Sequence, residues 1–420
     1  MIDRTQAPPV VSPSRLRLPA PKRYALANGI PVYEIDMGTQ EIVKIEWVFY
    51  AGRPHERAPL VANATATLLK EGTEPFSAAE IAERLDFYGG TLTTTTGMDT
   101  GSITLYGLNK HLEPLLEVFS AVATAPTFPQ NELTTYVDRQ KRRQQVDLER
   151  SDILAYREVT ERIFGDTHPY GYNSTPALYD ALTREQLVEH YRRCYTTGNG
   201  QLIVSGRLRS DMRALLERTC APLRRGERLH ASLSTTAEPP RTVRIDRPNA
   251  VQSAIRLGRR LELPPAERPL MLVLDVILGG YFGSRLMANV REDKGYTYNI
   301  FSSYDRLLQG AYFYIGTEVG TEVEQLALRE IYAEMARLRE ELVDEEELAM
   351  VRNYMLGTIL TSLDGPFNIS EIVRTLVLEA LPFEHTERVV TAIKGVTPEA
   401  LRDLARRVLR PETMWTVVVG

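Results

Sequence analysis

The sequence is poor in the residues that build metal centres and disulfide frameworks. Among 420 residues there are two cysteines, Cys194 and Cys220, and no Cys-x-x-Cys motif. We therefore expect no disulfide framework, a reducing compartment and thiols with a structural role. The six histidines are His55, His111, His168, His190, His230 and His385, and no two of them stand at helical spacing. His190 and Cys194 are four residues apart, and we interpret this isolated pair as packing residues.

Long apolar runs are also absent. The chain has no stretch of 18 apolar residues, whereas a helix that spans a bilayer needs about 20. Residues 1–9 lack the basic start and the apolar core of a signal peptide. These absences predict a cytoplasmic protein with no membrane partner. A periplasmic location stays open for a chain from which an export signal has been removed.

Neither sign of charge is in large excess. The formal net charge is -5, with 43% hydrophobic and 25% charged residues, which is close to average usage. This mild acidity argues against a nucleic-acid partner. The glycine-rich residues 279–284 have no lysine at P-loop spacing, which argues against a nucleotide site. There is no Gly-x-Ser-x-Gly elbow and no cysteine-centred signature, so an independent hydrolase of another class has no support.

Local patterns predict an extended arm, strands and helices. Five prolines occur within residues 1–22, and proline withholds a donor from helices and sheets, so we expect an extended arm there. Residues 29–36 and 43–50 are rich in β-formers. In the second stretch four apolar residues alternate with Lys44 and Glu46, a pattern typical of a half-buried strand.

Capping signals predict where two helices start. Ser77 with Glu80, and Thr183 with Gln186, have the spacing of a capping box. The first box predicts a helix over residues 78–88 that ends at the following glycine pair.

The two halves of the chain resemble each other. Residues 182–206 align without gaps with residues 396–420, at an offset of 214. A helix, a glycine turn and a β-hairpin are expected in each half, at 79–108 and 286–317. We predict an internal duplication of one α+β unit, in which each copy is a mainly antiparallel sheet covered by helices.

The length of the chain also favours two domains. After the arm of residues 1–22, we expect an N-terminal domain over residues 23–224 and a C-terminal domain over residues 248–420. Residues 225–247 lack apolar periodicity and are interpreted as a linker.

Residues 283–298 combine a charged helix end, a glycine break and an aromatic strand start. Arg291 and Tyr298 stand seven residues apart in this segment. A guanidinium and a phenol both donate hydrogen bonds, so together they can hold a substrate carbonyl or the oxyanion that forms on it. The alternative is structural: Arg291 closes a helix with a favourable charge, and Tyr298 packs among other strand aromatics.

The segment resembles the second-half signature of the pitrilysin, insulinase and mitochondrial processing peptidase family of inverted zinc metallopeptidases. Residues 168–171, the Gly-Thr pair at 72–73 and the duplicated halves extend the resemblance along nearly the full length. It implies that Arg291 and Tyr298 face the substrate.

Members of that family carry a His-x-x-Glu-His motif on the helix before the Gly-Thr pair, where two imidazoles hold zinc and the glutamate activates water. Here the three positions hold Asn63, Ala66 and Thr67. An amide and a hydroxyl are poor zinc ligands, and alanine cannot move a proton. The third ligand is expected within residues 142–147, which contain no glutamate, although Glu149 lies nearby. The chain is therefore expected to hold no metal or other cofactor.

The length and the order of these features match the short, two-chain form of the family. The resemblance then implies that the chain is the non-catalytic subunit of a heterodimeric zinc metallopeptidase that cleaves unfolded peptides. It would be inactive alone, and would contribute Arg291 and Tyr298 in trans to a homologous partner that holds the zinc. The alternative is a non-enzymatic peptide-binding or assembly protein that acts as a homodimer.

Residues 91–96 form a second candidate site. Thr93, Thr94 and Thr95 belong to a threonine-rich stretch that suits a strand, and a free strand edge could pair with an extended peptide. The resemblance implies that the corresponding strand holds substrate. An ordinary hairpin with a solvated face remains the alternative.

Overall fold

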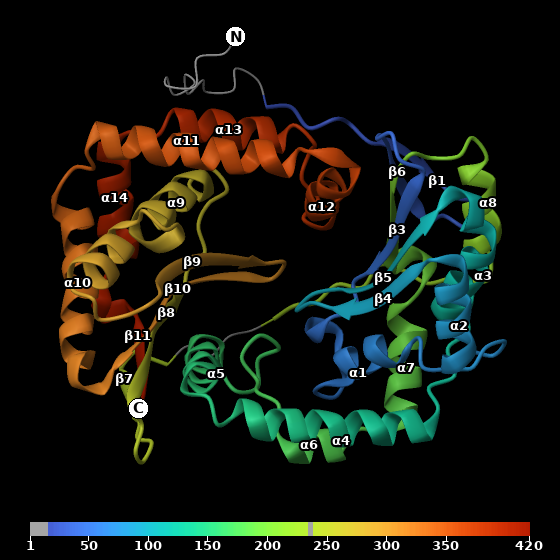
Figure 1. The fold of residues 1–420 in the computed structure, drawn as a ribbon, viewed down its shortest axis with the longest axis horizontal. Coiled ribbons are helices and arrows are strands. Elements are labelled where there is room, and N and C mark those ends of the chain that lie inside the picture. The colour runs from blue at the N-terminus through green and yellow to red at the C-terminus, as the bar shows by residue number, and fades with distance from the viewer. Residues whose placement is uncertain (1–15, 234–237) are drawn as a thin grey trace, which may run out of the picture.

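The computed structural model describes residues 16–233 and 238–420, and these build two sheets, each with helices on its outer side (Figure 1). The first sheet has the order β1-β2-β6-β3-β5-β4, and the second has the order β7-β11-β8-β10-β9. The strands of the first sheet are β1 (Lys22–Ala25), β2 (Pro31–Asp36), β3 (Ile42–Phe49), β4 (Thr91–Thr96), β5 (Gly101–Leu108) and β6 (Gly200–Gly206). Those of the second are β7 (Thr242–Ile245), β8 (Gln252–Arg260), β9 (Ile300–Leu307), β10 (Gly310–Gly320) and β11 (Trp415–Val419).

Apart from β1, the two sheets have the same topology. Strands β2, β6, β3, β5 and β4 correspond in order to β7, β11, β8, β10 and β9. In each sheet the first pair of this series is parallel and the other three pairs are antiparallel. The prediction of two homologous α+β units with mainly antiparallel sheets is therefore confirmed.

The helices outside each sheet pack on its apolar face or on one another. Those of the first half are α1 (Val61–Leu68), α2 (Ala78–Tyr88), α3 (Leu112–Thr124), α6 (Pro176–Asp180), α7 (Arg184–Cys194) and α8 (Met212–Cys220). Those of the second half are α9 (Arg268–Asp275), α10 (Glu324–Glu340), α13 (His385–Lys394) and α14 (Pro398–Val408). Both predicted capping boxes are present, at the starts of α2 and α7, and α2 ends at Gly89 with a positive φ of 62°.

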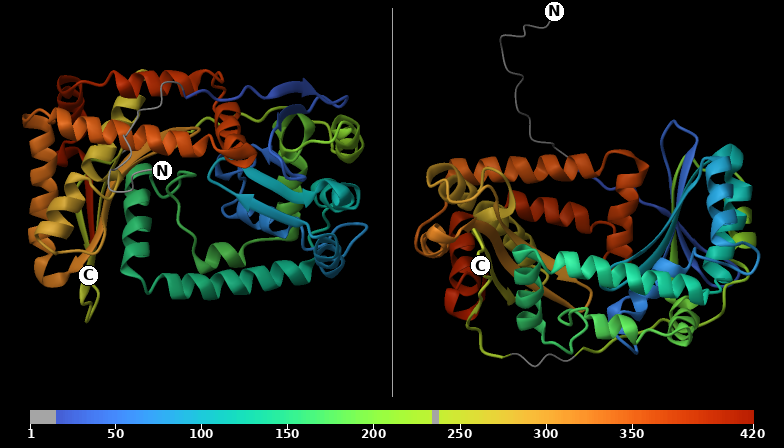
Figure 2. Two further views of the ribbon diagram at one scale, coloured as in Figure 1. Left: turned by 45° about the horizontal axis from the view of Figure 1, so that its top comes forward. Right: turned by 60° about the horizontal axis from the view of Figure 1, so that its bottom comes forward.

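Each half also supplies one helix to the sheet of the other half. The long helix α4 (Gln130–Asp147) leads away from the first sheet to α5 (Ser151–Phe164), which packs on β8 and β11 of the second sheet (Figures 1 and 2). In the same way α11 (Glu345–Ser362) leads to α12 (Gly365–Leu378), which packs on β2 and β6 of the first sheet. The bounds of α5 and α12 differ by the offset of 214 seen in the sequence repeat.

The packing in the structure differs from the predicted domain boundaries at two places. Residues 151–164 fall in the predicted N-terminal domain but pack on the C-terminal sheet. Strand β7 lies within the predicted linker, residues 225–247, and pairs in parallel with β11. A short edge strand with only four residues gives little apolar periodicity, so the sequence did not distinguish it from a linker.

The end of the predicted arm is anchored to the opposite half. Residues 1–15 lie outside the described residues. Leu16 is buried against Leu356 and Val390, and Leu18 packs in the cluster that α12 forms with the first sheet. Across residues 16–233 and 238–420, no helix combines the length and the apolar character needed to cross a bilayer.

Candidate functional site

Arg291 and Tyr298 lie together in the second half. Arg291 belongs to a π-helical segment, Met287–Asp293, and Tyr298 precedes β9. The Arg291 guanidinium carbon is 5.2 Å from the centre of the Tyr298 ring and 4.5 Å from that of Phe282. Tyr298 is 85% exposed and Phe282 is 64% exposed. Cation–π contacts orient the guanidinium but leave its N–H groups free to donate.

Buried hydrogen bonds hold the segment around Arg291 in place. The Asn289 side-chain amide donates to Glu330 Oε2 at 3.0 Å and to Glu334 Oε1 at 2.6 Å, both on α10. The Arg285 guanidinium forms two bonds with the Glu347 carboxylate of α11, at 2.9 and 2.7 Å. A π-helical turn is rare and is often found at functional sites. Anchors on two separate helices therefore fix the backbone that carries Arg291.

The three positions that the resemblance assigns to a degenerate zinc motif lie on α1, in the other half. Asn63 is exposed, and its Oδ1 accepts a hydrogen bond from the Tyr136 hydroxyl of α4 at 2.7 Å. Ala66 is buried at 1% exposure, and Thr67 is half-buried. Tyr136 lies earlier on α4 than the 142–147 stretch in which a third ligand was expected.

The donor set at this position does not suit zinc. The Asn63 carbonyl is already occupied by Tyr136, and Ala66 offers no group that could bind metal or move a proton. Glu149 lies beyond the end of α4 and forms an ion pair with Arg247 at 3.2 Å. Within the part of the chain that the structure describes, no group of three or more His, Cys, Asp or Glu side chains could hold a metal ion.

A half-buried carboxylate that the sequence did not single out, Glu56, fixes the start of α1. Glu56 Oε1 accepts from the Ala62 backbone N–H at 2.8 Å, and its Oε2 accepts from the Tyr172 hydroxyl at 2.7 Å. Burial raises the pKa of Glu56, and these bonds work against that rise. The Arg53 guanidinium carbon lies 4.4 Å from the centre of the Tyr172 ring. The start of α1 is thus fixed by hydrogen bonds to protein groups.

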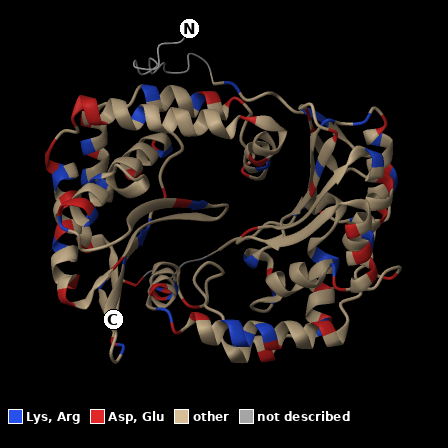
Figure 3. Cartoon of the chain, in the orientation of Figure 1, with Lys and Arg blue, Asp and Glu red and all other residues tan. Residues whose placement is uncertain are grey.

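Strand β4 stands at the end of the first sheet and pairs with β5 alone among the described strands. Thr93 and Thr95 are exposed and share one face, and Thr94 points to the other. Neither β4 nor β5 carries a charged residue (Figure 3). The Thr96 hydroxyl donates to the Ala62 carbonyl at 3.4 Å, so this edge strand runs beside α1. The uncharged edge could accept an extended peptide through main-chain hydrogen bonds.

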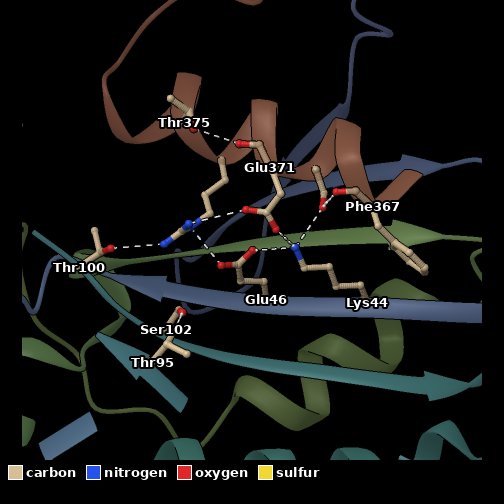
Figure 4. Close-up of polar contacts among 10 residues, drawn as sticks. Lys44, Glu46, Thr95, Thr100, Ser102, Phe367, Glu371 and Thr375 are labelled. Atoms are coloured by element: carbon tan, nitrogen blue, oxygen red, sulfur yellow. Dashed lines mark hydrogen bonds and ion pairs between the residues drawn. The ribbon is translucent and has the colours of Figure 1, made fainter. Parts of the chain in front are cut away.

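The prediction of a half-buried strand over residues 43–50 is wrong for the charged positions. Lys44 and Glu46 are 2% and 3% exposed because α12 covers this face of β3 (Figure 4). Lys44 Nζ lies 3.2 Å from Glu46 and pairs with Glu371 of α12, and Arg374 Nε lies 3.0 Å from Glu46. Burial alone would lower the pKa of Lys44, but the carboxylates of Glu46 and Glu371 outweigh burial and raise it.

Known proteins resemble this chain in sequence. The family profile "Peptidase M16 inactive domain" matches residues 181–355. The "Uncharacterized zinc protease YmxG" of Bacillus subtilis is 24% identical over 404 residues, which cover 92% of this chain and 95% of that protein. The "Non-peptidase homolog YmxG" of Helicobacter pylori is 21% identical and covers 82% and 81%.

Solved structures share the fold over almost the whole chain. A "peptidase M16 inactive domain" from Pseudomonas fluorescens superposes with a TM-score of 0.87 at 24% identity, covering 95% of this chain and 98% of that one. A protease from Helicobacter pylori also gives 0.87, at 15% identity and with 96% and 100% coverage. Residues 181–355 thus match an M16 inactive domain, and M16-like proteins resemble the chain over almost its whole length. The predicted resemblance to the family that includes pitrilysin, insulinase and the mitochondrial processing peptidases is therefore confirmed.

The chain combines an Arg–Tyr pair in its second half with a first-half helix that offers no zinc ligands. Arg291 and Tyr298 are in contact in the second half, whereas Asn63, Ala66 and Thr67 lie on a helix of the first half. No hydrogen bond or ion pair among the described residues joins the two sets.

Proposed function

We propose that the chain is the non-catalytic subunit of a two-chain M16 metallopeptidase. In this proposal Arg291 and Tyr298 contact the carbonyl group of a peptide that a homologous, zinc-bearing partner cleaves. The observation that carries the proposal is the contact of Arg291 with an 85% exposed Tyr298, on an anchored segment of a chain whose predicted motif positions offer no zinc ligands.

The proposal is supported by the unpaired charge of Arg291 and the exposure of Tyr298. No carboxylate among the described residues forms an ion pair with Arg291, although guanidinium groups on protein surfaces commonly do so. A free guanidinium and an exposed phenol can donate hydrogen bonds to an oxyanion as it forms. Water activation would be the task of the partner, since Ala66 stands at the position of the general base.

The free edge of β4 supplies a place for the peptide itself. Thr93, Thr94 and Thr95 would pair with an extended segment through their backbone groups, as in other cases of strand addition. An unfolded segment can adopt this conformation, whereas a folded domain presents few free strands. We therefore propose unfolded peptides as the substrate class.

A second candidate function is a peptide-binding or assembly protein that acts as a homodimer and has no enzymatic role. The β4 edge supports this candidate equally well, because strand addition needs no catalytic group. The two candidates differ in what they require of Arg291. Only the subunit hypothesis requires it for a chemical step.

The proposed function can be tested by isolating the tagged chain from its native cells and identifying any protein recovered in equal amount. A homologue with His-x-x-Glu-His would support the subunit hypothesis, and recovery of the chain only with itself would support the homodimer. The purified chain alone should hold no stoichiometric zinc and cleave no peptide. Zinc and activity that are both removed by a chelator would contradict both candidates. The cytoplasmic location stays a prediction, and 48% of the periplasmic protease PqqL from Escherichia coli has a similar fold.

A further inference from the structure

A cavity of about 270 Å³ lies where the two halves of the chain meet. Its walls come from the end of β3, the turn before β5, residues 228–231, the start of α9, the β9–β10 hairpin and the end of α12. Neither Arg291 nor the β4 edge lines it. The cavity is therefore separate from both parts of the proposed peptide site.

The walls of the cavity carry more positive than negative side chains. The two acidic groups are already engaged: Glu379 pairs with Arg306 at 2.5 Å, and Asp99 accepts bonds from the Leu308 N–H at 2.9 Å and from the Tyr170 hydroxyl. Arg228 and Arg268 also line the cavity. Among the described residues, neither of these two arginines forms an ion pair with a carboxylate.

The known contacts of these two arginines leave donors unused. The Arg228 guanidinium lies over the ring of Tyr50, and burial lowers the pKa of Arg228. Arg268 Nε donates to the Leu263 carbonyl at 3.2 Å. Each guanidinium has five N–H donors in a planar arrangement that suits an oxyanion. Two such groups beside one cavity can bind an anion.

A buried imidazole completes the wall. His55 is 9% exposed and lines the cavity, and no hydrogen bond to its ring is formed by the described residues. Burial, with further contributions from Arg193, Arg228 and His230, lowers the pKa of His55 to about 4. The neutral ring has one N–H donor and one acceptor. The ring nitrogens of His55 keep some exposure, so the N–H can donate to a ligand in the cavity.

We propose that this cavity binds a small oxyanion, a phosphate or carboxylate group, between Arg228, Arg268 and His55. The cavity is smaller than the roughly 300 to 1,000 Å³ of ordinary ligand pockets, so it suits one anionic group. His55 belongs to the first half, Arg268 to the second, and Arg228 to the segment that joins them. A bound anion therefore links the two halves and stabilises their arrangement. This proposal does not depend on the proposed peptidase role.

The test uses the purified full-length chain and inorganic phosphate as the first probe, followed by isothermal titration calorimetry and thermal denaturation. We expect saturable binding at one site per chain and a higher melting temperature. Arg228→Gln and Arg268→Gln should each weaken binding at least about tenfold, because each removes a charge-assisted hydrogen-bond donor. Arg329→Gln, which removes an exposed arginine of α10 outside the cavity, should bind as the unmodified chain does.

Two further probes distinguish the source of the anion. Acetate, and a short peptide with a free C-terminus compared with its amidated form, test whether a carboxylate replaces phosphate. Binding of any of these probes that depends on Arg228 and Arg268 supports the site. Circular dichroism confirms that each variant is folded. The proposal is overturned if no probe saturates, or if the Arg329→Gln control loses affinity as much as the two cavity variants.

Discussion

Lys44 on β3 pairs with Glu371 on α12, although the two residues come from different halves of the chain. Lys44 is 2% exposed and also contacts Glu46, which is itself buried. The pair therefore connects the first sheet to the helix that the second half supplies to it.

Replacing Lys44 should weaken this connection strongly. Lys44→Met removes one charge of a buried network and leaves its carboxylates less compensated, so we expect a loss of about 2 to 4 kcal/mol in the free energy of unfolding. Urea denaturation measures this loss. The matched control is Arg17→Ala, because the pair of Arg17 with Glu387 also connects distant segments but is exposed at both ends, and such pairs contribute less than about 1 kcal/mol. Equal effects of the two substitutions would contradict a structural role for the buried pair.

The exchange of α5 and α12 predicts that the two halves fold only together. A fragment that ends at residue 233 lacks α12 and exposes the apolar cluster of Tyr33, Ile35 and Ile203 on its first sheet. Each fragment alone should aggregate or show weak tertiary structure by near-ultraviolet circular dichroism. Co-expression of the two fragments should give one complex on a sizing column. Two separately folded, monomeric fragments would show that the exchanged helices are dispensable.

Peptide binding at the β4 edge should depend on main-chain hydrogen bonds of one register. In an added strand, alternate backbone N–H groups face the neighbouring strand and the others face away. Of two unfolded peptides N-methylated at alternate residues in opposite registers, one should lose at least about tenfold in affinity and the other should lose little. Fluorescence polarisation measures both. Equal affinities for both peptides would exclude strand addition at this edge.

Stability should fall in mild acid because of a buried histidine. Burial lowers the pKa of His190 to about 4, from an ordinary value of 6.5, and its Nε2 lies 3.0 Å from the Ala51 carbonyl. Between these two values the unfolded chain binds more protons, so the free energy of unfolding decreases as pH falls from 6.5 to 4, by roughly 3 kcal/mol for this group. Asp275 acts in the opposite direction, because burial raises its pKa to about 6.

A variant separates the contribution of His190 from those of other groups. His190→Gln keeps a donor near the Ala51 carbonyl but does not titrate. Its stability, measured by urea denaturation at pH 7 and pH 5, should decrease less than that of the unmodified chain. His230→Gln removes an exposed histidine and serves as the control. If His190→Gln shows the same acid sensitivity as the unmodified chain, His190 is not the group responsible.

Local features of the fold were predictable from the sequence, and features that depend on distant segments were not. The capping box of Ser77 with Glu80 is satisfied within four residues, and the helix forms with the predicted bounds. Alternation on β3 correctly gave the faces of Lys44 and Glu46. It could not show that α12, more than 300 residues away, covers the polar face.

In the candidate site, too, contacts between residues close in sequence were predictable and contacts between distant residues were not. The Gly295 turn brings Arg291 and Tyr298 together over a short distance in sequence, so their contact could be anticipated. Phe282 lies in the glycine-rich residues 279–284, for which the sequence predicted no role, and its position against Arg291 depends on the π-helical geometry. Glu56 was missed because a single glutamate outside any motif carries no signal of burial.

The most direct test of the central claim is the rate of peptide cleavage by the chain reconstituted with its zinc-bearing partner. Arg291→Ala should lower kcat by about 100-fold, the cost of losing one donor to a developing oxyanion, while the subunits remain associated on a sizing column. Arg329→Ala, on the outer helix α10, should retain full activity. Unchanged kcat in the Arg291→Ala pair, with both subunits assembled, would contradict the proposed role of Arg291.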